Sequence, residues 1–250
     1  MIIQIQKLIL IMMRITAFMV TSPGYSFRGI PNILKVAISG VVTIFIYMAL
    51  PDMAIVGGIS EFAFLAIKET IFGLSIGFVT QMIFSTIEMA GKLIDFQVGF
   101  SMGAVYDPAM GAQASNYGRT YYWIAIAIFF LLDMHQLLLE MVIRSYEFMP
   151  IGSVSIEKFN PEAIVVIFSR VFELSINLAA PMIITVLITD VVLGLISRTV
   201  PQINVFMLGM PMKSMVSFLV FLVSISWIMN SAGNIIETIP KYIEGVMVLF

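Results

Sequence analysis

Long runs of apolar residues, separated by proline, glycine and charged stretches, make up most of this chain. A helix that crosses a bilayer needs about 20 mostly apolar residues, and several runs reach or exceed that length. The pattern predicts an all-α, membrane-associated protein of about six long hydrophobic helices in hairpins, several of them interrupted, within one domain over residues 1–250. The helices are expected at about 2–21, 33–50, 60–90, 120–143, 162–197 and 205–236, with a short amphipathic tail after them.

The composition excludes most other classes of protein. With 60% hydrophobic and 11% charged residues, the chain has too little polar surface for a soluble domain and too much to bury for a disordered one. A net charge of −2 and the lack of a basic tail argue against a nucleic-acid partner. Without cysteine, disulfides, thiolate metal sites and cysteine nucleophiles are excluded. The first run lacks the pattern of a cleaved signal peptide and is expected to be a retained helix.

Ionisable residues lie inside the apolar runs, where one charged side chain facing lipid costs about 2.5–3.5 kcal/mol. Several of them are spaced so that opposite charges meet on one helix face. One reading is that pairing within the helix makes the charges tolerable. The other is that these faces are covered by protein, including other subunits, and have a role in assembly. The pairs are Glu88–Lys92, Glu140–Arg144 and Arg170–Glu173.

Motifs for catalysis are weak. Residues Gly73 to Gly77 match a G-x-S-x-G nucleophile elbow, but that motif needs a strand-to-helix turn, and here it lies inside a helical run. The same two glycines form a small-xxx-small face that favours close helix packing. His135 is the only histidine, so paired-histidine metal sites are excluded, and no nucleotide-binding loop is present. We therefore expect neither an enzyme nor a bound cofactor or metal.

The segment 91–119 is too polar to face lipid and too apolar for an exposed loop. Irregular backbone at membrane depth is tolerated only where it is buried in protein or lines a cavity. Glycines permit a sharp bend, from which Phe100 and Met102 would project bulky apolar groups. The segment is either a short re-entrant connector or a plug-like loop that obstructs an aqueous path.

Two separated signatures resemble the FliR family of flagellar biosynthesis proteins. The first runs from Glu88-Met89-Ala90-Gly91 through Gly99-Phe100 to Asp107-Pro108, and the second is Pro201-Gln202-Ile203-Asn204-Val205-Phe206 followed by Gly209, Pro211 and Lys213. The resemblance spans nearly the whole chain, and the homologous export-apparatus protein of virulence type III secretion is the near relative. It implies a subunit of the type III export gate in the bacterial inner membrane, at the flagellar basal body.

The same resemblance implies partners and site residues. The partners are the FliP and FliQ gate subunits, FlhB, unfolded exported proteins in transit, and lipid. A pore plug maps onto Gly99, Phe100, Ser101, Met102, Gly103, Asp107 and Pro108. The second signature is either a helix–turn–helix connector or a contact site for neighbouring subunits, with Lys213 near the membrane surface or paired with an acid. Its residues are Pro201, Gln202, Asn204, Gly209, Pro211 and Lys213.

The sequence leaves open two alternatives to a flagellar export-gate subunit. The near relative makes a virulence export-apparatus subunit possible in place of a flagellar one. A small-molecule or proton-coupled transporter is suggested by Arg170, Glu173 and Asp190 and by a kink or break expected at Pro181, since discontinuous helices with embedded charges are typical of transporters. No internal repeat supports the transporter.

Overall fold

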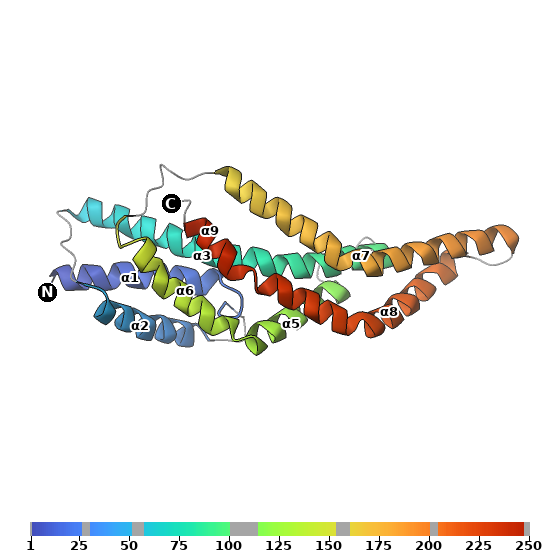
Figure 1. The fold of residues 1–250 in the computed structure, drawn as a ribbon, viewed down its shortest axis with the longest axis horizontal. Helices are drawn as coiled ribbons and strands as arrows, with labels where there is room; N and C mark the ends of the chain where they lie inside the picture. Colours follow the sequence, from blue (N-terminus) through green and yellow to red (C-terminus); the bar gives the residue numbers. More distant parts are fainter. Residues whose placement is uncertain are drawn as a thin grey trace. The chain divides into compact units, whose positions relative to one another are not determined.

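The computed structural model describes residues 2–26, 31–51, 58–100, 115–153, 161–200 and 205–247 (Figure 1). Most of these residues are helical and none is in a strand, which confirms the predicted all-α fold class. The helices are α1 (Ile2–Thr21), α2 (Asn32–Ala49), α3 (Ile59–Val98), α5 (Asn116–Leu131), α6 (Met134–Phe148), α7 (Pro161–Thr199), α8 (Val205–Ile236) and α9 (Ile239–Met247).

Helix α3 is longer than predicted, because it passes Ala90 and ends at Val98. Buried apolar side chains continue at helical spacing through this stretch, at Ile87, Ile94 and Val98. The predicted helix ended just before Gly91, yet a glycine inside a helix is tolerated where another backbone approaches closely, as that of Gly118 does here.

The predicted plug-like segment 91–119 is therefore helical at both ends, over 91–98 and 116–119, and this corrects its boundaries. Its central part, residues 101–114, lies outside the described residues.

The single helix predicted over 120–143 is instead two helices, α5 and α6. Asp133 between them has a φ of 53°, in the left-handed region, and the two helices are bent by 71° at this break. A left-handed residue cannot continue a right-handed helix, and aspartate is one of the few side chains that tolerate it.

Of the kink or break expected at Pro181, the break does not occur, because α7 stays helical through this residue. Proline removes one backbone hydrogen bond and crowds the carbonyl four residues before it, at a cost of about 3 kcal/mol. A helix of 39 residues keeps its other backbone hydrogen bonds on both sides of this position. Helix α8 likewise contains Pro211 and keeps the predicted bounds.

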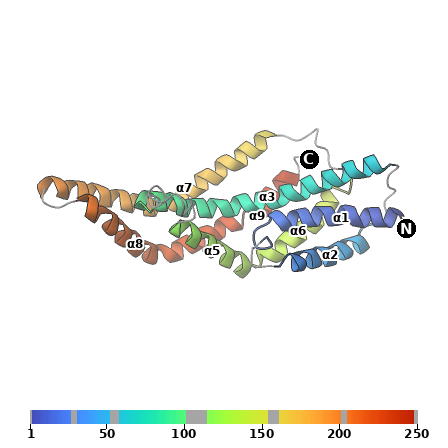
Figure 2. The same cartoon turned by 180° about the vertical axis from the view of Figure 1, so that it is seen from behind.

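The chain divides into two compact units. The first comprises residues 1–83, 129–168 and 237–250. In it, α1 and α2 lie side by side as an antiparallel hairpin, since Lys7 near the start of α1 donates to the carbonyls of Tyr47 and Leu50 at the end of α2 (Figures 1 and 2). α6 packs on α9. Fully buried core side chains include Leu10, Ile15, Phe18, Phe72, Ile76 and Leu138.

The second unit comprises residues 84–128 and 169–236. It holds the end of α3, most of α5 and α7, and α8. The hydroxyl of Ser175 on α7 donates to the carbonyl of Thr86 on α3 at 2.9 Å. Its fully buried core includes Phe84, Ile87, Tyr121, Ala179, Val186 and Ile228. The single-domain organisation over 1–250 stays a prediction.

Five described helical stretches are long and apolar enough to cross a membrane, or six if α5 and α6 form one bent span. Helix α3 has 40 residues and α7 has 39. At about 1.5 Å per residue each is roughly 60 Å long, about twice the thickness of a hydrocarbon core. A large part of each helix therefore lies beyond any single bilayer core that it crosses.

Candidate functional site

In the second unit, the described residues on either side of segment 101–114 meet at one carboxylate. Asp95 on α3 is buried, and its Oδ2 accepts the hydroxyl of Ser115 at 2.6 Å. The backbone N–H of Tyr117 donates to Oδ1 at 3.1 Å, and that of Gly118 donates to Oδ2 at 3.2 Å. The side chain therefore caps the start of α5, although it belongs to α3.

The backbone of Asp95 binds the two residues that precede this segment. Its carbonyl accepts the N–H of Gly99 at 3.1 Å and that of Phe100 at 3.0 Å. Gly99 has a φ of 98°, a value that glycine adopts without strain, and it ends α3 with a left-handed cap. Of the predicted plug residues, Gly99 and Phe100 are described. Ser101, Met102, Gly103, Asp107 and Pro108 lie outside the described residues.

Aromatic rings extend this junction to α8. The ring of Phe100 stacks on that of Tyr117, with centroids 6.2 Å apart and planes at 28°. The Tyr117 hydroxyl is hydrogen-bonded to the Ser217 hydroxyl at 3.0 Å, and its ring lies 5.6 Å from that of Phe221. The end of α3, the start of α5 and the middle of α8 are therefore joined at one place.

Two glycines let α3 and α5 approach closely here. A Cβ at Gly91 would lie 2.5 Å from the backbone nitrogen of Gly118, and one at Gly118 would overlap the Ser115 hydroxyl. Neither position has room for a side chain, so the short helix separation that Asp95 bridges depends on both glycines.

The C-terminal signature lies partly outside the described residues, which leave out Pro201, Gln202 and Asn204. Lys213 on α8 forms an ion pair with Asp190 on α7, which agrees with the expectation that it pairs with an acid. Asp190 also accepts the side-chain amide of Gln97 from α3 at 3.3 Å. Gly209 is buried in α8, and Pro211 is exposed. Lys213 thus joins helices within this chain.

The three charge pairs expected from the sequence are all present, each with an N–O distance of 2.6 Å. None of them is buried within this chain. The Arg144 and Glu140 side chains, for example, are 58% and 51% exposed. Pairing within each helix is therefore observed, and coverage of these faces by other subunits stays a prediction. The residues are Glu88, Lys92, Glu140, Arg144, Arg170 and Glu173.

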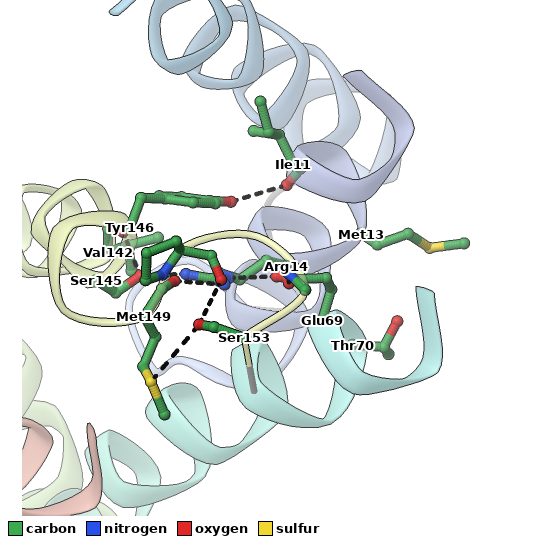
Figure 3. Close-up of polar contacts among 12 residues, drawn as sticks. Ile11, Met13, Arg14, Glu69, Thr70, Val142, Ser145, Tyr146, Met149 and Ser153 are labelled. Carbon is green, nitrogen blue, oxygen red and sulfur yellow. Dashed lines mark hydrogen bonds and ion pairs between the residues drawn. The ribbon is translucent and has the colours of Figure 1, made fainter. Parts of the chain in front are cut away.

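The fully buried ion pair of the described chain, between Arg14 on α1 and Glu69 on α3, was missed by sequence reasoning. Arg14 Nε lies 2.6 Å from Glu69 Oε2, and both side chains have no exposed surface (Figure 3). The guanidinium also donates to the Ser145 hydroxyl and to the Met149 carbonyl, each at 3.1 Å. Glu69 Oε1 accepts the N–H of Gly152 at 2.9 Å.

This buried pair connects four parts of the first unit: α1, α3, α6 and the turn after α6. The guanidinium also lies over the ring of Tyr146, 4.0 Å from its centroid, and the Tyr146 hydroxyl donates to the carbonyl of Ile11 (Figure 3). A lone arginine inside an apolar run was the available signal, but its partner lies 55 residues away, outside the reach of helix spacing rules.

Gly73 and Gly77 lie where α3 meets α1. A Cβ at Gly73 would overlap the carbonyl of Arg14, and one at Gly77 would overlap the Thr21 side chain. The two glycines thus permit the helix approach at which Arg14 reaches Glu69.

No cluster of three or more metal-ligating side chains occurs among the described residues. His135 follows the bend between α5 and α6, where its ring lies 5.2 Å from that of Phe130 and its carbonyl accepts the Tyr25 hydroxyl at 2.5 Å. Burial raises the pKa of Tyr25, so this phenol stays a donor.

An all-α chain with five or six candidate membrane spans, and with buried polar groups such as Arg14, Glu69 and Asp95 bonded between helices, is a helical membrane protein. The family model for bacterial export proteins, family 1, matches residues 5–239, and the chain belongs to that family. This confirms the resemblance seen in the sequence, and components of an export apparatus associate with other export proteins.

Named relatives cover both branches of this family. The flagellar biosynthetic protein FliR of Bacillus subtilis is 29% identical over 245 residues, which is 96% of this chain and 94% of that protein. FliR of Aquifex aeolicus is 30% identical over 95% of this chain and 92% of that protein. The secretion system apparatus protein SsaT of Salmonella typhimurium is 30% identical over 65% of this chain and 63% of that protein.

Proposed function

We propose that this chain is a subunit of the flagellar type III protein export gate, and that it helps to form and close the channel through which flagellar proteins leave the cell. The observation that carries the proposal is the near full-length similarity to flagellar FliR proteins. The similarity to the Salmonella virulence protein covers a shorter part of both chains, which favours the flagellar system.

The proposed partners are FliP, FliQ and FlhB, in the bacterial inner membrane at the flagellar basal body. Many large apolar side chains support packing against other chains, because they are exposed here. On α8 they include Met207, Phe218, Leu222 and Val223. The lengths of α3 and α7 also support packing against other chains. The parts of these helices that extend beyond a bilayer core cannot bury their apolar side chains in lipid.

We propose that the segment from Gly99 to Pro108 obstructs the channel. An open path for unfolded proteins would leak ions, and a constriction lined by soft apolar groups closes a pore by excluding water. Phe100, held against Tyr117 at the start of this segment, is the described residue that supports this role.

Two observations in the structure argue against the transporter alternative. Asp190 is paired with Lys213, and Pro181 does not interrupt α7.

Membership in the gate is tested by expressing a tagged chain with and without FliP and FliQ. We expect a stable complex with both partners and loss or aggregation of the chain alone. A stable, monodisperse chain that fails to bind either partner would contradict the proposal.

The plug is tested by deleting Phe100 to Gly103 and measuring ion leakage in cells that still assemble the complex. We expect raised leakage. The matched control is deletion of four residues between α6 and α7, Val154 to Glu157, which should leave leakage unchanged. An assembled deletion complex that stays as tight as the unaltered one would refute the plug.

A further inference from the structure

Asp95 is placed to do more than cap a helix. Its side chain takes three donors from the start of α5, while its backbone carbonyl takes two from the end of α3. The residues on one side are 99 and 100, and those on the other are 115, 117 and 118. They are the last described residues before segment 101–114 and the first after it.

The chemistry of this contact suits a fixed anchor. A buried carboxylate is costly unless it is fully hydrogen-bonded, and here each oxygen has at least one donor. The start of α5 adds the positive end of a helix dipole, which stabilises a negative charge at that place. Asp95 is 2% exposed, so water does not compete for these donors.

We propose that Asp95 is a positioning residue of the export gate: one buried residue that ties the end of α3, at residues 99 and 100, to the start of α5, at residues 115–118. This rests on the proposed function. A neutral or shorter side chain at this position would loosen the start of α5 from the end of α3, so that residues 100 and 115 would no longer be held at one place.

Tyr117 links the hydrogen bonds of Asp95 to further contacts, including one with α8. Tyr117, whose N–H binds Asp95, also stacks on Phe100 and is hydrogen-bonded to Ser217 of α8. Loss of the carboxylate is therefore expected to loosen the Phe100–Tyr117 stack as well as the cap.

The test variant is Asp95→Asn, which keeps the shape of the side chain but replaces one acceptor oxygen with a donor and removes the charge. Ser115→Ala is a milder second variant that deletes one of the three donors and leaves the two backbone ones. The matched control is Asp133→Asn. Asp133 is an exposed aspartate with no side-chain cap hydrogen bond, in a left-handed conformation that asparagine tolerates.

The variants are measured in the assembled complex by amide hydrogen exchange and by ion leakage. We expect roughly tenfold faster exchange over residues 115–118 in Asp95→Asn, the size of one lost hydrogen bond, and a smaller increase in Ser115→Ala. Leakage should rise in the same order, remaining below that of the Phe100–Gly103 deletion. Asp133→Asn should match the unaltered complex in both measurements.

The outcomes separate the anchor from the plug. Suppose that the complex with the Phe100–Gly103 deletion leaks ions, while the Asp95→Asn complex shows neither leakage nor faster amide exchange. In that case Asp95 is not a positioning residue, and the proposal of a plug stands. If Asp95→Asn speeds exchange but neither it nor the deletion leaks, the anchor stands and the plug fails. Should Asp95→Asn not assemble, Ser115→Ala decides, and unchanged exchange in that variant overturns the anchor.

Discussion

Replacing Glu69 by glutamine tests whether the first unit depends on its buried charge pair. Both side chains of the pair are fully buried, so the variant leaves the Arg14 guanidinium without a counter-charge in a site that water does not reach. Breaking a buried pair by removing one partner costs about 3–5 kcal/mol. Glutamine has one oxygen where glutamate has two. If that oxygen keeps the hydrogen bond from the N–H of Gly152, the side-chain N–H2 faces the Arg14 Nε–H, so both the charge and one acceptor are lost.

The assay is thermal unfolding of the purified complex, followed by size-exclusion chromatography after heating. For a chain of this size about 1 kcal/mol shifts Tm by roughly 2–4 °C, so we expect a fall of about 6–20 °C. The matched control is Glu140→Gln, which removes the same charge from a half-exposed pair on α6. Its effect should stay within about 1 kcal/mol.

A double variant sharpens the test. Arg14→Met with Glu69→Leu removes both charges and leaves only neutral groups unpaired, among them the carbonyl of Met149 and the N–H of Gly152. It should be less destabilised than the sum of the single variants Arg14→Met and Glu69→Leu, by about 2 kcal/mol or more. The reasoning is refuted if Glu69→Gln behaves like Glu140→Gln, or if the two single effects simply add.

Three further predictions concern packing, charge and pH. Gly77→Ala should destabilise the complex by about 1–3 kcal/mol through overlap with α1, whereas Gly40→Ala, which meets nothing within 4 Å, should be neutral or slightly stabilising in the same unfolding assay. Asp190→Lys alone should lower the yield of complex, because it places two positive charges next to each other. The double variant Asp190→Lys with Lys213→Asp exchanges the two charges and should restore the yield. Equal yields from the single and double variants would count against the ion pair. Because burial raises the pKa of Tyr25, the unfolded chain ionises first, so stability should fall as pH rises above about 10; Tyr25→Phe should flatten that fall, and an unchanged slope would show that other groups cause it.

Local pattern was enough to predict the helices where one face stays apolar over many turns. Helices α1 and α8 begin and end within one residue of the predicted bounds, because proline, glycine and polar clusters flank them. The bend at Asp133 was not predictable in this way. It depends on one residue adopting a left-handed conformation, and nothing in its sequence neighbourhood marks it.

The candidate site was predictable only in part, because sequence spacing indicates contacts within one helix but not contacts between helices. Charge pairs within one helix follow from spacing, and all three are present. The pairing of Arg14 with Glu69, and the capping of α5 by Asp95, join positions far apart in the chain, so they follow from tertiary packing alone.

The bend between α5 and α6 also bears on which side of the membrane each end of the chain occupies. The two halves have 16 and 15 residues, or about 24 Å and 22 Å, so neither alone reaches across a core of about 30 Å. If the pair crosses as one element, the candidate crossings number six and both ends of the chain lie on the same side. If it enters and returns, they number five and the ends lie on opposite sides. The conformation of one aspartate thus bears on an even or odd count of crossings, which reporter fusions at the two ends would read directly.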